Sequence, residues 1–205
     1  MPTSNKNTYL LIVTNCINKI YDIFLGTFMV SFLFRKTEES VTDISIYHLT
    51  CYMFVAILAY LTGNWIKRGN RLLMYQLGII TTFIGFMFFI YLQDDIINYI
   101  PFCGIVFGII MSCKAFPFNL IEADNVPASK MITFKGYLES LKNIIRVASP
   151  LILGFFLTFD SYFKTVAFLV FLSVFEFVLF SMIKAPVRKN LPPMKIKTFW
   201  QKTKD

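Results

Sequence analysis

Six long apolar runs, separated by short polar stretches, constrain this 205-residue chain more than any other feature of its sequence. A membrane-spanning helix needs about 20 predominantly apolar residues, because each residue adds about 1.5 Å of rise. Six segments meet this length, with bounds near 8–34, 44–66, 72–92, 98–119, 131–159 and 162–183. The sequence therefore predicts an all-α, polytopic membrane protein with six transmembrane helices.

The composition supports the same class of protein. Hydrophobic residues make up 56% of the chain and charged residues only 16%, too few to cover the surface of a soluble globule. The 24 phenylalanines and 10 tyrosines suit a lipid-facing surface with aromatic side chains at its interfaces. A net charge of +8 would also suit nucleic acid, but many of the cations lie in short loops and in the tail. We therefore expect the lipid bilayer, and no nucleic acid, as a partner.

The predicted helices fall into two groups of three, joined by the polar loop 93–98. Because three is an odd number, the second group must be inverted relative to the first, which is a recurrent plan of transporters. The six-helix transmembrane domain covers residues 1–183. Residues 184–205 are polar, basic and proline-containing, and we interpret them as a cytoplasmic tail or an interdomain linker.

The distribution of cations predicts the orientation in the membrane. Basic residues in short loops stay on the cytoplasmic side. With the amino terminus inside, thirteen loop and tail cations are cytoplasmic, against Arg35, Lys36 and Lys164 outside. The cytoplasmic set is Lys6, Lys67, Arg68, Arg71, Lys130, Lys135, Lys184, Arg188, Lys189, Lys195, Lys197, Lys202 and Lys204. We therefore expect a multi-pass protein of the cytoplasmic membrane with both termini in the cytoplasm.

The first predicted helix carries four polar residues at membrane depth: Asn15, Asn18, Lys19 and Asp22. Their offsets of three, four and seven place them on one helical face. Lys19 and Asp22 are spaced to form an ion pair within the helix, which lowers the cost of burying either charge. Two interpretations remain open: a polar stripe that lines a central cavity, or a self-neutralised pair buried for packing.

The fifth predicted helix has the longest polar stripe: Lys135, Glu139, Lys142 and Arg146. Glu139 lies four residues after Lys135 and three before Lys142, so part of the charge cancels locally. Arg146 has no carboxylate within its own turn and needs a partner elsewhere. A guanidinium suits the carboxylate or phosphate of a substrate. The alternative partner is Asp22 of the first helix.

Two further ionisable residues lie in the apolar runs. Glu176 in the sixth helix is close in depth to Lys142, and a structural ion pair is the first interpretation. A proton-coupling carboxylate is the alternative, because burial favours the neutral form of a carboxyl group. Lys114 lies near the inner end of the fourth helix, from which its ammonium group can snorkel to the headgroups.

The sequence contains few features that are typical of an enzyme. His48 is the only histidine, and no nucleophile motif, GxGxxG or Walker loop is present. The four cysteines lie within apolar runs without metal-ligand spacing, so we expect buried free thiols and neither a metal site nor a cofactor. Gly104 and Gly108 form a small-xxx-small step that predicts close helix contact.

The loop between the second and third helices, GNWIKRGNR at residues 63–71, resembles the helix 2–3 loop motif of the major facilitator superfamily (MFS). Gly63, Arg68 and Arg71 fall on matching positions of that motif. The sequence departs from it at Lys67, which replaces an acidic residue that latches the loop to the other half of the family's proteins. The region 119–154 more weakly resembles the family's acidic inner loop and the helix that follows it.

By this resemblance the chain is similar to the amino-terminal half of an MFS transporter. Helices 1, 2, 4 and 5 would then line a cavity, with helices 3 and 6 outermost. The resemblance favours Lys19, Asp22, Lys142 and Arg146 as cavity residues, and Glu176 as structural. Because that family holds its substrate between two six-helix halves, we expect a second half or a homodimer, or else a truncated gene product.

The function expected from these observations is transport of a small polar or anionic solute by alternating access. The alternative is a truncated or regulatory membrane protein with no transport activity of its own. Residues expected to bind solute are Asn15, Lys19, Asp22, Lys142 and Arg146; those for coupling or a structural ion pair are Glu139 and Glu176; those of the cytoplasmic loop motif are Gly63, Lys67, Arg68 and Arg71.

Overall fold

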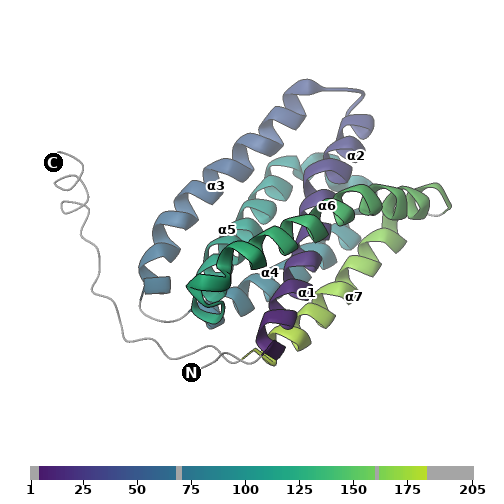
Figure 1. Ribbon diagram of the computed structural model, residues 1–205. Coiled ribbons are helices and arrows are strands. Elements are labelled where there is room, and N and C mark those ends of the chain that lie inside the picture. Colours follow the sequence, from purple (N-terminus) through teal and green to yellow (C-terminus); the bar gives the residue numbers. More distant parts are fainter. Residues whose placement is uncertain (1–4, 68–70, 160–161, 184–205) are drawn as a thin grey trace.

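The computed structural model of the chain describes residues 5–67, 71–159 and 162–183. Every regular element in these ranges is helical, and none of the described residues lies in a strand. The helices pack as a bundle (Figure 1). In chain order they are α1 (Asn5–Ile23), the π-helical turn η1 (Phe24–Phe28), α2 (Met29–Lys36), α3 (Val41–Lys67), α4 (Arg71–Leu92), the 3-10 helix η2 (Gln93–Tyr99), α5 (Ile100–Asn125), α6 (Ala128–Phe159) and α7 (Tyr162–Ser181).

Five stretches of the described residues are long and apolar enough to cross a membrane. They correspond to the first, second, third, fourth and sixth predicted spans. The prediction of an all-α, multi-pass membrane protein is therefore confirmed. The five stretches are Lys6–Lys36, Val41–Gly63, Arg71–Leu92, Asp95–Asn125 and Lys164–Ser181.

The fifth predicted span forms a helix, α6, but it is not among these five stretches. It carries Lys135, Glu139, Lys142 and Arg146, and these charges lower its hydropathy. The side chain of Glu139 is 55% exposed, and Arg146 is exposed as well. This helix therefore packs one face on its neighbours and leaves a charged face uncovered.

The first span is one rod interrupted by the π-helical turn η1. The N–H of Met29 donates to the carbonyl of Phe24, which closes the wider turn before α2 begins. The sequence predicted a continuous helix here and did not predict the π turn. Such turns are rare and occur mostly as single bulges within longer helices.

The packing follows a regular pattern in which α5 is central (Figure 1). α5 packs against α3 and α4, α4 packs against α7, and α1 packs against α6 and α7. If the first three spans are exchanged with the last three, α3–α5 becomes α6–α1 and α4–α5 becomes α7–α1. The contact between α4 and α7, the third spans of the two groups, is unchanged by this exchange. The contacts therefore have the exchange symmetry expected of two inverted three-helix repeats.

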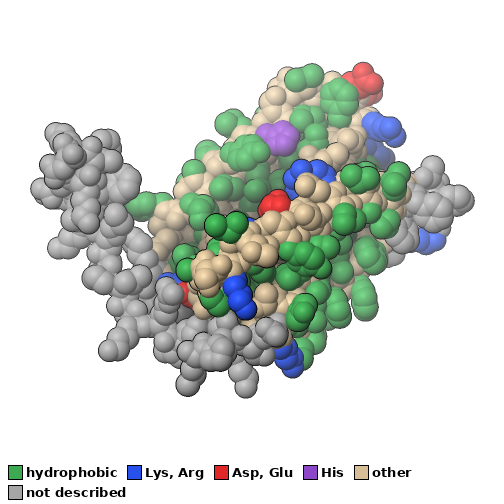
Figure 2. All heavy atoms as spheres, viewed as in Figure 1, with side chains coloured by type: hydrophobic (Ala, Val, Ile, Leu, Met, Phe, Trp, Pro, Cys, Tyr) green, Lys and Arg blue, Asp and Glu red, His purple; other side chains and the backbone are tan. Residues whose placement is uncertain are grey.

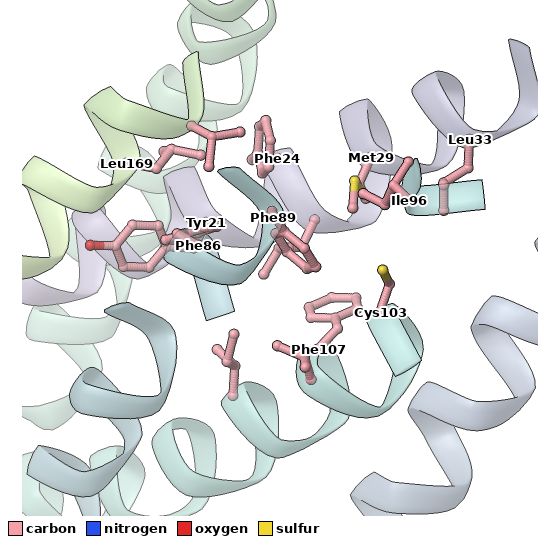
Figure 3. Close-up of a cluster of buried hydrophobic side chains, with 14 of the residues drawn as sticks. Tyr21, Phe24, Met29, Leu33, Phe86, Phe89, Ile96, Cys103, Phe107 and Leu169 are labelled. Atoms are coloured by element: carbon pink, nitrogen blue, oxygen red, sulfur yellow. The ribbon is translucent and has the colours of Figure 1, made fainter. Parts of the chain in front are cut away.

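The largest apolar core among the described residues lies where α1, η1, α4, α5 and α7 meet, and α2, α3 and η2 add residues to it (Figure 3). Tyr21 packs against Phe86 with ring centroids 5.4 Å apart, and Phe24 meets the same ring at 6.0 Å. Aromatic pairs of this kind contribute about 0.5–1.5 kcal/mol each beyond their buried area. These contacts hold α1 against α4 and so fix the orientation of the polar face of α1.

Glycines allow α3 and α5 to pack closely. A Cβ at Gly104 would lie 2.1 Å from the Thr50 hydroxyl and 2.4 Å from the Tyr47 carbonyl oxygen. One at Gly108 would lie 2.5 Å from the Cys51 carbonyl oxygen. The close contact predicted from this small-xxx-small step is confirmed.

The fourth predicted span is longer than expected at its carboxyl end. The sequence suggested an end near Asn119, but α5 continues to Asn125 and is followed by an extended residue, Val126. Glu122 and Asp124 therefore lie within a helix, where Glu122 is fully buried, and not in a loop. This difference brings two carboxylates into the bundle that the sequence had placed outside it.

Candidate functional site

A buried ion pair joins α5 to α7. The Lys114 ammonium lies 2.7 Å from Glu176 Oε2, with side chains 6% and 0% exposed. Glu176 therefore lies in an ion pair, as the first interpretation of this residue requires, but its partner is Lys114 and not Lys142. The prediction that Lys114 snorkels towards the headgroups is wrong, because this side chain is buried within the bundle.

Two further helices contribute to this pair. The Tyr75 hydroxyl on α4 donates to Glu176 Oε1 at 2.6 Å, and the Asn18 amide on α1 donates to the same hydroxyl at 2.5 Å. Tyr75 is fully buried. The network of Asn18, Tyr75, Glu176 and Lys114 therefore links four helices through charge-assisted and neutral hydrogen bonds, which satisfy the buried groups.

Aromatic rings surround the ammonium group of this network. Lys114 Nζ lies 4.5 Å from the centroid of the Tyr21 ring and 5.7 Å from that of Tyr75. A cation in this position is attracted by the negative faces of the rings, most strongly where water is excluded. Tyr21 thus contacts both the apolar core and the charged network.

Gly78 on α4 makes room for the Lys114 side chain. A Cβ at this position would lie 2.6 Å from Lys114 Cγ and 3.0 Å from the Cys113 carbonyl oxygen. No side chain larger than hydrogen fits without displacing the lysine or separating α4 from α5. Gly78 was not among the predicted site residues, although a glycine among the apolar residues of the third span is a sign of close helix approach.

Beside this network a cavity of about 190 Å³ lies between α1, α5 and α6. The half-exposed Asp22 and the exposed Asn119 lie on its wall, so the cavity opens to the surface of the bundle. Tyr21 and apolar side chains form the rest of the wall. Its polar lining residues are Asn15, Asn18, Asp22, Lys114, Asn119 and Lys142.

Three of the five residues expected to bind solute line this cavity: Asn15, Asp22 and Lys142. Lys19 and Arg146 are not among its lining residues. Lys19 lies 4.0 Å from Asp22, which confirms the predicted pair within α1. The Arg146 guanidinium donates to the Asn143 side-chain oxygen at 3.2 Å, and this contact is exposed.

One ion pair of α6 lies along its own helix. The Lys142 ammonium lies 2.9 Å from a carboxylate oxygen of Glu139, three residues earlier. Lys142 therefore lines the cavity while its ammonium group is paired with Glu139 of the same helix. Glu139 faces outward, and Arg146 follows it along the same exposed surface. Figure 2 shows charged side chains among hydrophobic ones on the visible face of the molecule.

A second polar cluster lies nearer the hairpin end of the bundle, where α3 leads into α4. The Asn15 amide donates to Glu122 Oε1 at 2.9 Å, and Lys135 pairs with Glu122 Oε2. Glu122 thus ties α1, α5 and α6 together. Glu122 was not among the predicted site residues because the predicted fourth helix ended near Asn119, although the apolar spacing continues through Phe118 and Ile121.

The loop motif is partly described. Arg71 forms a salt bridge with Asp124 at the end of α5. A Cβ at Gly63 would meet no atom within 4 Å. Arg68, the side chain of Lys67 and the tail 184–205 lie outside the described residues. The motif therefore contacts the second three-helix group through Arg71.

Within the described residues, no group of three or more His, Cys, Asp and Glu side chains could hold a metal ion. The four cysteines are free thiols, three of them buried and Cys16 partly buried, as predicted. No protein-family model, no curated protein and no solved structure matches this chain.

Proposed function

We propose that this protein is a six-helix transport unit of the MFS type, which moves a small polar or anionic solute across the cytoplasmic membrane by alternating access. The observation that carries this proposal is the polar cavity between α1, α5 and α6. Polar side chains at membrane depth are costly and mark solute pathways. Transporter sites lie near the midplane, at the interface between repeats.

The packing of the bundle supports the same proposal. Its exchange symmetry fits two inverted three-helix repeats, and α1 and α5 are the corresponding first helices of the two groups. Both helices contribute polar side chains to the cavity. The 63–71 loop supports the family resemblance at Gly63, Arg68 and Arg71, and the cations of the loops and tail support cytoplasmic termini.

The uncovered polar face supports a larger assembly. Glu139 and Arg146 on α6 are exposed, and so is Asp22 on α1. Exposed charges of this kind are expensive against lipid tails. We propose that a second six-helix half, or a second copy of the chain, covers this face and completes the cavity.

The test is uptake of a panel of labelled small polar and anionic solutes by cells expressing the chain, together with any six-helix protein that copurifies with it. Asp22→Asn and Lys142→Gln should abolish the uptake of a transported solute without lowering the amount of protein in the membrane. Asp95→Asn and Lys130→Gln are matched controls, since both residues are exposed and lie outside the cavity.

One observation favours the alternative of a regulatory membrane protein without transport activity. The charges near the cavity are internally paired, as Lys19–Asp22, Lys142–Glu139 and Lys114–Glu176. Such pairs also serve packing alone. Uptake by cells that express the wild-type chain no greater than that of cells without it would favour this alternative. Uptake that is unchanged in both cavity variants would contradict a solute path through this cavity.

A further inference from the structure

A second cavity lies at the end of the bundle opposite the 63–71 hairpin, beside the last turns of the first span. Its volume is about 560 Å³, and it shares no lining residue with the cavity between α1, α5 and α6. The turn η1 and α2 supply most of its wall, and Gly154 on α6 and Tyr162 at the start of α7 complete it. The proposed solute site therefore does not account for this cavity.

The greater part of this wall is apolar, with the side chains of Phe24, Phe28, Met29, Phe32 and Tyr162. The rings of Phe32 and Tyr162 stack with their centroids 4.5 Å apart, and the Tyr162 hydroxyl donates to Met29 Sδ at 3.8 Å. Ligand cavities of about 300–1,000 Å³ have walls of this kind, with a few polar groups that fix the orientation of the ligand. Such a wall suits a hydrocarbon chain better than water, which needs several polar partners.

Three polar residues, Thr27, Ser31 and Arg35, form one side of the cavity. Their spacing of four places them on one helical face. All three are exposed, so the cavity opens along the flank of the bundle. Thr27 lies within the π-helical turn η1, and turns of this kind occur frequently at functional sites.

Arg35 supplies the charge of this wall. It lies in the last turn of α2, where the first span reaches the level of the lipid headgroups. The described residues give its guanidinium no hydrogen-bond or ion-pair partner. The exposed Glu38 and Glu39 follow in the next turn, and neither is among the described residues of the wall. A guanidinium in this position suits a phosphate, which it binds through two parallel hydrogen bonds.

We propose that this cavity binds an anionic phospholipid from the leaflet opposite the hairpin. Its phosphate pairs with Arg35, and one acyl chain lies along Phe28, Phe32 and Tyr162. Ser31 lies about 6 Å deeper than Arg35 at helical rise, near the level of the lipid's ester groups. A soluble anion would leave the apolar wall facing water, whereas a phospholipid covers this wall and enters sideways through the bilayer. The proposal goes beyond transport and does not depend on it.

The first test compares two lipids with identical dioleoyl chains, phosphatidylglycerol and phosphatidylcholine. Native mass spectrometry measures the binding of the first lipid molecule to the purified full-length chain in neutral detergent micelles. We expect phosphatidylglycerol to bind about tenfold more tightly, because a hydrogen-bonded charge pair is gained without a competing lipid cation. Arg35→Gln should remove this preference. Lys164→Gln is the matched control, since Lys164 is an exposed cation at the same end of the bundle and outside the wall.

Equal affinity of the wild type for the two lipids overturns the proposal, and this comparison requires no variant to fold. A preference that is retained in Arg35→Gln overturns it as well. An equal loss of preference in Lys164→Gln would show general attraction to the cations at this end of the bundle, and would also contradict a site at Arg35.

The second test fills the cavity. A Cβ at Gly154 would meet no atom within 4 Å, so Gly154→Leu adds an apolar side chain to the space that the acyl chain would occupy. We expect this variant to bind phosphatidylglycerol about tenfold more weakly than the wild type. Gly136→Leu should bind as the wild type does, because Gly136 lies on the same helix with equal space around it and outside the cavity.

Unchanged binding in Gly154→Leu would contradict an acyl chain in this cavity. So would displacement of phosphatidylglycerol by millimolar glycerol 3-phosphate, which carries the phosphate without the chains. Failure of this competitor, together with the loss in Gly154→Leu, supports a site for the whole lipid.

Discussion

Two lysine–glutamate ion pairs lie in very different surroundings. Lys114 and Glu176 come from helices far apart in the sequence, and their side chains are 6% and 0% exposed. Lys142 and Glu139 are three residues apart on one helix, with side chains 20% and 55% exposed. The first pair joins helices, and the second neutralises one helix face. The difference predicts which variants lower stability and which affect only the proposed transport.

The largest expected effect comes from breaking the buried pair. Lys114→Met leaves Glu176 buried without its cation, which should lower the free energy of unfolding by about 3–5 kcal/mol. The double variant Lys114→Met/Glu176→Leu should recover most of this loss, since neither charge remains. Equilibrium unfolding in mixed micelles measures both. A double variant no more stable than the single one would contradict the account.

Removal of the Tyr75 hydroxyl should have the next largest effect. Tyr75→Phe leaves a Glu176 oxygen without its donor and the Asn18 amide without its acceptor, at a cost of about 1–3 kcal/mol in unfolding free energy. Tyr91→Phe is the matched control, because Tyr91 is 83% exposed. Equal stability of the two variants would show that the hydrogen bonds of Tyr75 contribute nothing.

Gly78→Ala tests the space occupied by Lys114. The added methyl group would lie 2.6 Å from Lys114 Cγ, and we expect overpacking to cost about 1–3 kcal/mol. At Gly136 on α6 no atom lies within 4 Å of an added Cβ, so Gly136→Ala should be neutral or stabilise the helix by up to about 1 kcal/mol. Thermal unfolding of both variants checks this contrast, which fails if Gly78→Ala is the more stable.

The smallest effect on stability is expected in the exposed pair. Lys142→Gln should change the unfolding free energy by no more than about 0.5 kcal/mol, because exposed pairs on one helix contribute little. The same variant should lose uptake, since Lys142 lines the cavity. A destabilisation as large as that of Lys114→Met would remove the distinction between the two pairs.

The difference between a pair within one helix and a pair that joins distant helices also explains which features could be predicted from the sequence. Apolar runs and their length predicted the helices, because hydropathy is a local property. The Lys19–Asp22 and Glu139–Lys142 pairs were predictable because a helix brings residues three apart onto one face. The Gly104–Gly108 step was predictable for the same reason.

Features that depend on packing between distant segments could not be predicted in this way. The partner of Glu176 lies 62 positions away on α5. Nothing in the local sequence indicates that Gly78 admits Lys114 to this pair. Glu122 was missed because the α5 boundary was placed at Asn119, and helix boundaries depend on tertiary contacts beyond local pattern.

The most direct test of the transport account is access to the cavity from both sides of the membrane. Ala115→Cys places a thiol on the cavity wall in a chain whose four native cysteines are replaced by alanine. The account predicts that a membrane-impermeant thiol reagent labels this position from either side, and that Tyr91→Cys is labelled from one side only. Labelling of Ala115→Cys from one side alone, in the presence and absence of solute, would contradict alternating access through this cavity.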